Sequence, residues 1–296
     1  MPAIPQNQLD LFVASSNDIA TKEQQDLMSR CWFSLSTQKR IKPIFHEFGD
    51  NWVKITGDAD YGIATMNDND VLLFVVSHYM DALNRGVPAE KIGRRFRFTG
   101  YEFFSFIGKK KFSGKGYADL WKSLQRLHHT FVETNIRQDE GRRHHSFNWL
   151  SEIKQTTQGN KHRGFEIVIP EFIYDSVVGN MKNVLTLDDG YFSIRSSLER
   201  WLYLFARKSS GWNVNGWSEG LESVHLKSGS VGTFPEFRRA ITKIINKGSI
   251  LGYKVELLEM PRQQGIHIRR DNELIELVGK DRPARGAIKW RGIRNE

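Results

Sequence analysis

Cysteine is almost absent from this sequence. Among 296 residues only Cys31 is a cysteine, so the chain forms no internal disulfide and no zinc site built on cysteine pairs. A single cysteine fits a reducing compartment, and we expect the cytoplasm. Cys31 lies in the apolar stretch 30–33. A thiol in such a stretch is expected to be buried and unreactive.

Long hydrophobic runs are also missing. The longest, Val71–Val76, is far too short for a membrane-spanning helix, which needs about 20 residues. Residues 1–6 contain no basic segment followed by an apolar one, so no signal peptide is evident. We therefore expect no membrane partner.

The sequence motifs of nucleotide and metal chemistry are absent as well. No Gly-x-x-x-x-Gly-Lys-Ser/Thr motif occurs, which argues against ATP use. His128–His129 and His144–His145 have no acid or further histidine at a known ligand spacing. A rolling-circle nickase needs a histidine pair, but Arg269 stands two residues after His267 where the second histidine would be. The sequence thus predicts no metal and no other cofactor.

One acidic group needs a separate interpretation. A nuclease would need clustered carboxylates to hold its metal ions. The only dense group consists of Asp58, Asp60, Asp68 and Asp70. We interpret these residues as markers of turns and of a helix N-terminus, where negative charge is favoured. The prediction is a protein that is not an enzyme, with a magnesium-dependent nuclease as the alternative.

What the sequence does have is positive charge. Lys and Arg number 43 against 34 Asp and Glu, a formal net charge of +9. Such a surplus favours a polyanionic partner. Part of it lies after Gly279, where we expect a basic, disordered tail over residues 276–296. Hydrophobic residues make up 39% of the chain, and its length suggests two domains.

The first half of the chain has the element order of a winged-helix domain: helix, turn, helix, then a hairpin with a basic tip. Apolar residues recur at helical or strand spacing along it. The expected strands are 44–48, 52–56, 95–98, 131–137 and 147–153, and the expected helices are 69–84, 101–107 and 117–130.

The second half repeats this order. Its expected helices are 188–207, 221–227 and 233–246, and its expected strands are 253–258 and 265–270. The last helices of the two halves align at an offset of 117 residues, and the alternative is a chance overlay of two amphipathic helices. The matched residues are Tyr117, Leu120, Leu124 and Leu127 with Phe234, Phe237, Ile241 and Ile244.

The repeat predicts an α+β protein with two tandem winged-helix domains. We expect a flexible N-terminal arm over residues 1–25, a first domain over 26–160, a second domain over 161–275 and the basic tail.

The helix 233–246 carries the strongest local signal for binding DNA. Thr233 and Glu236 fit a capping box at its start. A polar stripe opposite its apolar side suits a major groove, because Arg bonds bidentately to guanine and Asn to adenine. The stripe consists of Arg239, Thr242, Lys243 and Asn246. The alternative is an ordinary solvated helix face.

Other cations are candidates for the same interface. Lys122 and Arg126 match Arg239 and Lys243 across the repeat. We also expect contacts to DNA phosphates, which add affinity but do not distinguish one base sequence from another. They are expected at the turn before the helix 117–130 and at the hairpins. These candidates are Lys109, Lys110, Lys111, Lys115, Arg142, Arg143, Arg262, Arg269 and Arg270.

Several segments together resemble the replication initiator protein A family of bacterial plasmids, itself similar to tandem winged-helix initiators. The resemblance extends from about residue 9 to about residue 260. It rests on Leu9–Val13, Cys31–Ser36, Leu185–Asp188, Leu198–Lys208, Lys227–Ser230 and Glu236–Ala240.

This resemblance implies a protein that binds repeated double-stranded sites at a plasmid origin. It would promote opening of the adjacent DNA, recruit the host initiator and replicative helicase, and repress its own gene as a homodimer. A winged-helix transcriptional repressor without a replication role is the alternative. Residues that the resemblance implies to face DNA are Lys227, Ser228, Ser230, Arg238 and Arg239.

Overall fold

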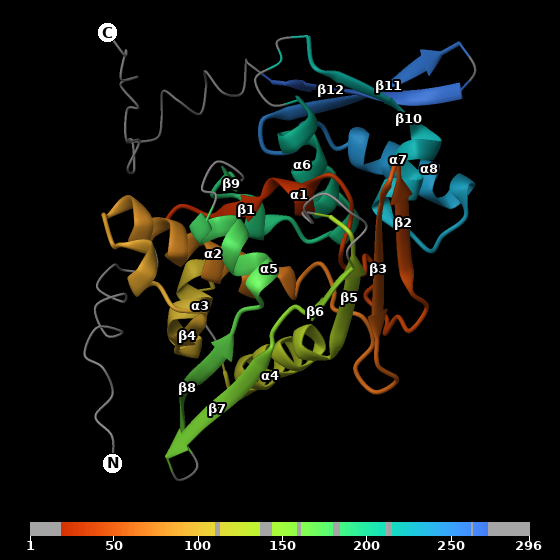
Figure 1. The fold of residues 1–296 in the computed structure, drawn as a ribbon. Coiled ribbons are helices and arrows are strands. Elements are labelled where there is room, and N and C mark those ends of the chain that lie inside the picture. Colours follow the sequence, from red (N-terminus) through yellow and green to blue (C-terminus); the bar gives the residue numbers. More distant parts are fainter. Residues whose placement is uncertain are drawn as a thin grey trace, which may run out of the picture.

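The structure is a computed structural model of the chain. It describes residues 19–271 except 110–112, 137–143, 159–160, 180–183, 211–212, 214 and 262. Its elements form two halves with the same order of helices and strands, and a further four-stranded sheet accompanies the first half (Figure 1).

The first half begins with α2, a helix buried on nearly every side. Its residues match the predicted span, and its continuous apolar run reflects that burial. A three-stranded sheet in the order β4-β8-β7 accompanies three helices. The elements are α2 (Asn69–Asn84), β4 (Arg95–Phe98), α3 (Gly100–Phe106), α4 (Gly114–His129), β7 (Glu152–Gln158) and β8 (Lys161–Val168).

The second half has the same sequence of elements. Its sheet has the order β10-β12-β11, so the first strand again pairs with the last, as in the first half. Its elements are α6 (Ser197–Ser210), β10 (Trp217–Gly220), α7 (Leu221–Ser228), α8 (Phe234–Ile245), β11 (Tyr253–Met260) and β12 (Gln263–Arg270). The repeated strand order agrees with the internal repeat predicted from the sequence. The first helix of the second half was predicted to start at Asp188, but α6 starts at Ser197. Residue 188 instead belongs to a turn, in which the Asp188 carboxylate accepts a hydrogen bond from the Gly190 N–H.

A four-stranded sheet accompanies the first half and has no counterpart among the described residues of the second. Its strands are β2 (Ile44–Phe48), β3 (Asn51–Gly57), β5 (Thr130–Thr134) and β6 (His145–Asn148), in the order β2-β3-β5-β6. The predicted pairing of β5 with β6 is confirmed, but its expected role as the hairpin of the first domain is wrong. The counterpart of β11–β12 is β7–β8, which projects at the opposite end of the molecule (Figure 1).

The N-terminal boundary also differs from the expectation. Residues 22–24 form β1 (Lys22–Gln24), which pairs with β9 (Val184–Thr186), and Ile19 is buried. The expected mobile arm therefore does not include residues 19–25, and residues 1–18 and the tail 276–296 lie outside the described residues. The expected boundary after residue 160 falls between β7 and β8, the paired strands of one hairpin.

Short elements complete the fold. They are α1 (Gln25–Met28), η4 (Ala89–Lys91), α5 (Glu171–Tyr174), η5 (Asp175–Gly179) and η7 (Tyr191–Ser193). Cys31 is buried, and burial raises the pKa of its thiol to about 12, as expected of an inert cysteine.

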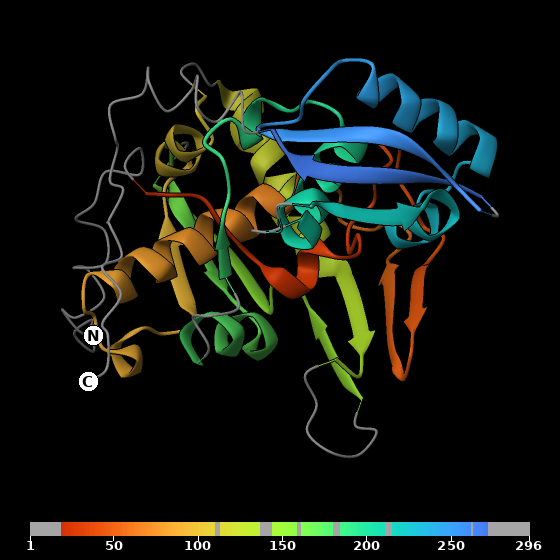
Figure 2. The same cartoon turned by 90° about the horizontal axis from the view of Figure 1, so that it is seen from above.

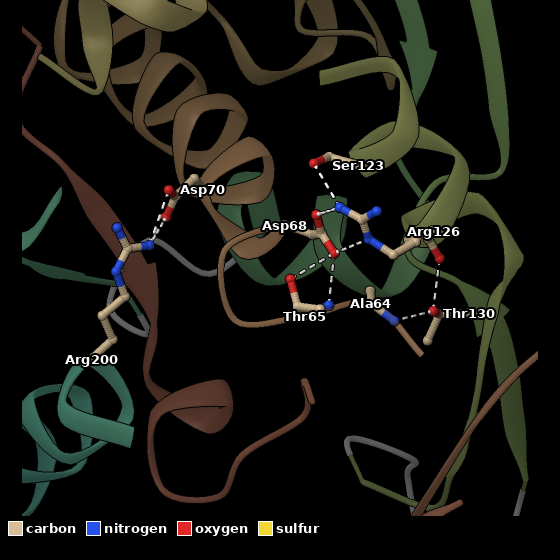
Figure 3. A network of polar contacts seen from close by, with 8 residues as sticks. All are labelled: Ala64, Thr65, Asp68, Asp70, Ser123, Arg126, Thr130 and Arg200. Carbon is tan, nitrogen blue, oxygen red and sulfur yellow. Dashed lines mark hydrogen bonds and ion pairs between the residues drawn. The ribbon is translucent and has the colours of Figure 1, made fainter. Parts of the chain in front are cut away.

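A buried polar cluster joins the first helices of the two halves. Arg200 of α6 donates to both carboxylate oxygens of Asp70 in the first turn of α2, at 2.8 and 3.0 Å (Figure 3). Glu23 of β1 lies beside this pair and accepts a hydrogen bond from the Asn69 amide at 2.7 Å. Both side chains are buried. The halves are thus connected by charge as well as by a shared apolar core.

Glu23 should make stability depend on pH. Burial raises its pKa from 4.5 to about 7, so between these values the folded chain holds a proton that the unfolded chain has lost. Stability attributable to Glu23 therefore falls as pH rises from about 4.5 to 7. Glu23→Gln removes this dependence, and at pH 8 we expect it to be more stable than the parent by about 3 kcal/mol. Urea unfolding at pH 5 and pH 8 measures this, and an equal difference at both pH values would contradict it.

Candidate nucleic-acid interface

α8 is held with one side in the core and the other outward. Its capping box is present: the Thr233 backbone N–H and hydroxyl both donate to the Glu236 carboxylate, at 2.7 and 2.8 Å. Phe237, Ile241 and Ile244 are buried against the sheet of the second half. Cap and buried stripe together fix the rotation of the helix about its axis.

The opposite side of α8 is an open cationic surface. Arg238, Arg239, Lys243 and Asn246 are exposed, and with Thr242 they line a shallow hollow beside Phe234 and Pro235. Within the described part of the chain, the side chains of Arg238 and Lys243 have no hydrogen-bond or ion-pair partner. Their charge is therefore available to a ligand. The polar stripe predicted for this helix lies where the sequence placed it.

The matching helix of the first half is only partly available. Lys115 and Lys122 are exposed on α4. Arg126, however, donates to both oxygens of Asp68, at 2.6 and 2.7 Å, and Asp68 is fully buried (Figure 3). Asp68 also accepts from the N–H and hydroxyl of Thr65. Arg126 is thus a structural residue here, in contrast to its expected outward role.

This contact predicts a stability effect for Arg126→Ala. Asp68 would keep its two hydrogen bonds from Thr65 but lose the one cation paired with it in the part of the chain that the structure describes. We expect a loss of about 2–3 kcal/mol in the free energy of unfolding. Thermal or urea unfolding measures it, with Lys122→Ala as the matched control on the same helix, expected to be nearly neutral. Equal stabilities of the two variants would refute the structural role.

The Lys-Ser-Gly-Ser motif builds a turn, which corrects part of the expected DNA-facing set. Ser228 is buried, and its hydroxyl donates to the His225 carbonyl at 2.6 Å. Lys227 forms an ion pair with the half-buried Glu219. Gly229 ends α7 in the left-handed conformation, with φ of 60°. Ser230 is half-buried, and its N–H donates to Ser228. The motif shapes the α7–α8 turn, so Lys227 and Ser228 do not face outward.

The remaining predicted cations are scattered. Lys109 is exposed and lies over the Phe104 ring. Arg269 lies 3.5 Å from Glu256 on the β11–β12 hairpin, and Arg270 is half-buried. Five predicted residues lie outside the described residues: Lys110, Lys111, Arg142, Arg143 and Arg262.

The acidic group is dispersed over separate structural partners. Asp68 and Asp70 bind the two arginines already described, and Asp58 accepts the N–H groups of Asp60 and Tyr61 in a turn. Across the described ranges, no three His, Cys, Asp or Glu side chains are grouped so that they would hold a metal ion. No described helix is both long and apolar enough to cross a membrane.

Sequence reasoning missed one basic segment. It contains Lys39, Arg40 and Lys42 within four residues. This density of cations just before Pro43 could have identified the segment as a candidate for binding DNA. Arg40 donates to the Gly229 carbonyl at 2.6 Å, which brings this segment to the turn that precedes α8.

These observations define a class of protein: an α+β fold of two similar halves, with an exposed cationic helix in the second half. The crystal structure of domains 2 and 3 of RctB is similar, with a TM-score of 0.59 at 12% identity. The match covers 83% of this chain and 98% of that one. At this identity the likeness concerns the fold alone.

The chain belongs to the replication initiator protein A family, whose model matches residues 22–255. A relative from Wigglesworthia glossinidia brevipalpis, described as a putative replication protein, is 31% identical over 254 residues. That match covers 83% of this chain and 88% of the relative. The family predicted from the sequence is confirmed, and the protein is a member of a family of replication initiators.

Proposed function

We propose that the protein starts plasmid replication by binding repeated double-stranded sites at the origin, with α8 in the major groove. The observation that carries the proposal is the outward face of α8, where Arg238, Arg239, Lys243 and Asn246 are exposed on a helix anchored by its buried side. Arg and Asn supply base contacts, and Lys supplies phosphate contacts.

In this proposal each half is a winged-helix module. The common order of helices and strands and the common strand order of the two small sheets support it. The hairpin β11–β12 would lie along the DNA backbone beside α8, where Arg269 is half-exposed. Binding would promote opening of adjacent DNA and recruit the host initiator and replicative helicase, and dimers would repress the gene. The protein would act by binding, with no catalytic step of its own.

Two measurements test this proposal. Duplexes that tile the DNA around the gene are titrated at several salt concentrations, and we expect one repeated site to bind at about 10⁻⁸ M or tighter, weakening steeply with salt. A marker without its own origin, joined to the gene and its flanking DNA, should then replicate after transformation. Specific binding without replication would favour a transcriptional repressor, and no specific site would reject both functions.

A further inference from the structure

The basic segment 36–42 lies between the two halves of the candidate interface. On one side, Arg40 donates to the Gly229 carbonyl in the turn before α8. On the other side, Thr37 and Lys39 line a cleft of about 330 Å³ that Lys122 of α4 also lines. The segment therefore connects the neighbourhoods of the two helices. In Figure 2 the yellow-green α4 and the blue α8 both lie towards the upper side of the view, whereas Figure 1 separates them along the height of the molecule.

The segment is held in place by its own hydrogen bonds. The Arg40 guanidinium also donates to the carbonyls of Lys42 and Pro43, at 2.9 and 3.1 Å. The Ile63 N–H donates to the Arg40 carbonyl at 2.8 Å, and the Gln38 N–H donates to the Ser36 hydroxyl at 3.0 Å. A segment fixed this way loses little conformational entropy when it meets a ligand.

Its cations point to solvent. Lys39 and Lys42 are exposed. Lys39 donates to the Ala59 carbonyl at 2.8 Å, which fixes its position without neutralising its charge. The Lys42 ammonium has no hydrogen-bond or ion-pair partner among the residues that the structure describes. Exposed ammonium groups without a counter-ion, such as those of Lys39 and Lys42, are groups that a nucleic-acid phosphate binds.

The charges in the cleft also favour an anion. Lys39 and Lys122 contribute two positive charges that have no counter-ion among the described residues, whereas the Asp68 carboxylate is already neutralised by Arg126. Asp119, one turn before Lys122 on α4, is the remaining carboxylate of the cleft lining. Ser36, Thr37 and Ser123 add hydroxyl groups, which commonly contact phosphate and sugar.

We propose that residues 36–42 form a phosphate-contacting segment that extends the DNA-binding surface of α8 towards Lys122 of α4. The ligand is the sugar–phosphate backbone of the duplex that α8 reads, so this inference rests on the proposed function. Lys39 and Lys42 contact phosphates and contribute affinity without base choice. Arg40 is a positioning residue that anchors the segment to the α7–α8 turn.

The test compares exposed lysines in two places. Lys42→Ala should weaken the origin site and an unrelated duplex alike, roughly fivefold, and reduce the salt slope by about 1; the double variant Lys39→Ala with Lys42→Ala should reduce it by about 2. Lys91→Ala on η4 is the control, because Lys91 is also exposed and has no side-chain partner in the described ranges. It should leave affinity and slope unchanged.

A change of opposite sign completes the test. Asp119→Asn removes a carboxylate from the same cleft and should strengthen both duplexes by roughly twofold. If the parent binds and Lys42→Ala behaves like Lys91→Ala, the phosphate-contacting role is wrong while the function of α8 stands. If the parent binds no duplex specifically, the proposed function itself fails. Circular dichroism spectra confirm that each variant is folded.

Discussion

Replacing Arg238, Arg239 and Lys243 together with alanine should reduce specific DNA binding at least about 1000-fold. The three side chains are exposed on one face of α8, and each good base contact contributes about 1–3 kcal/mol, while the loss of cations weakens phosphate binding further. Anisotropy titration of the origin site, at one fixed salt concentration, measures the loss. The fold should be unaffected, because the buried side of α8 is unchanged.

The single variants separate base reading from general attraction. Arg239→Ala should relax base preference at one position of the site, whereas Lys243→Ala should weaken all sequences alike. Arg126→Lys, on the corresponding helix of the first half, is the matched control: it keeps a cation beside Asp68 and should leave base preference unchanged. If Arg239→Ala retains both affinity and base preference, α8 is not the reading helix.

Removing the Asp70 carboxylate should destabilise the protein by about 3–5 kcal/mol. Burial raises the pKa of Asp70 to about 6 despite the neighbouring Arg200, so at pH 7.5 the carboxylate is mainly ionised and paired. Asp70→Ala leaves the Arg200 guanidinium buried without a counter-ion among the described residues, with the backbone oxygens of Ile194 and Phe192 and the face of the Tyr191 ring as its partners. Urea unfolding at pH 7.5 measures the loss.

A double variant identifies the cause of that loss. Asp70→Leu with Arg200→Met removes both charges and keeps apolar volume, so it should be markedly more stable than Asp70→Ala alone. A double variant no more stable than the single one would show that packing around α2, and not the unpaired guanidinium, accounts for the cost.

Local patterns in the sequence were sufficient to predict much of the fold. The apolar run of residues 69–84 and the alternation of 95–98 gave α2 and β4 with their observed bounds. Thr233 and Glu236 gave the start of α8, because a capping box depends on residues only three apart. The outward stripe of α8 followed from its helical period and a well-buried opposite face.

Features that depend on distant residues were not predictable in this way. Strand β7 was missed because residues 152–158 are mostly polar and carry little alternation. Strand β8 was missed as well, because only Phe165 and Ile167 alternate with polar residues and its first half is polar. Arg126 looked like a free cation because its partner, Asp68, is 58 positions away. The Lys-Ser-Gly-Ser motif resembled a DNA-binding motif, but it forms the turn between α7 and α8. Gly229 has a left-handed backbone conformation there, and Ser228 is buried.

Local DNA cleavage from a single labelled position tests most directly whether α8 lies in the groove. Val231 is exposed just before α8, and Cys31 is buried, so Val231→Cys offers one reactive thiol for an iron chelate. Lys91→Cys carries the same chelate on η4. We predict that the complex labelled at 231 cuts both strands within each repeat and that the complex labelled at 91 does not. Bound DNA cut equally from both positions, or from neither, would contradict the account.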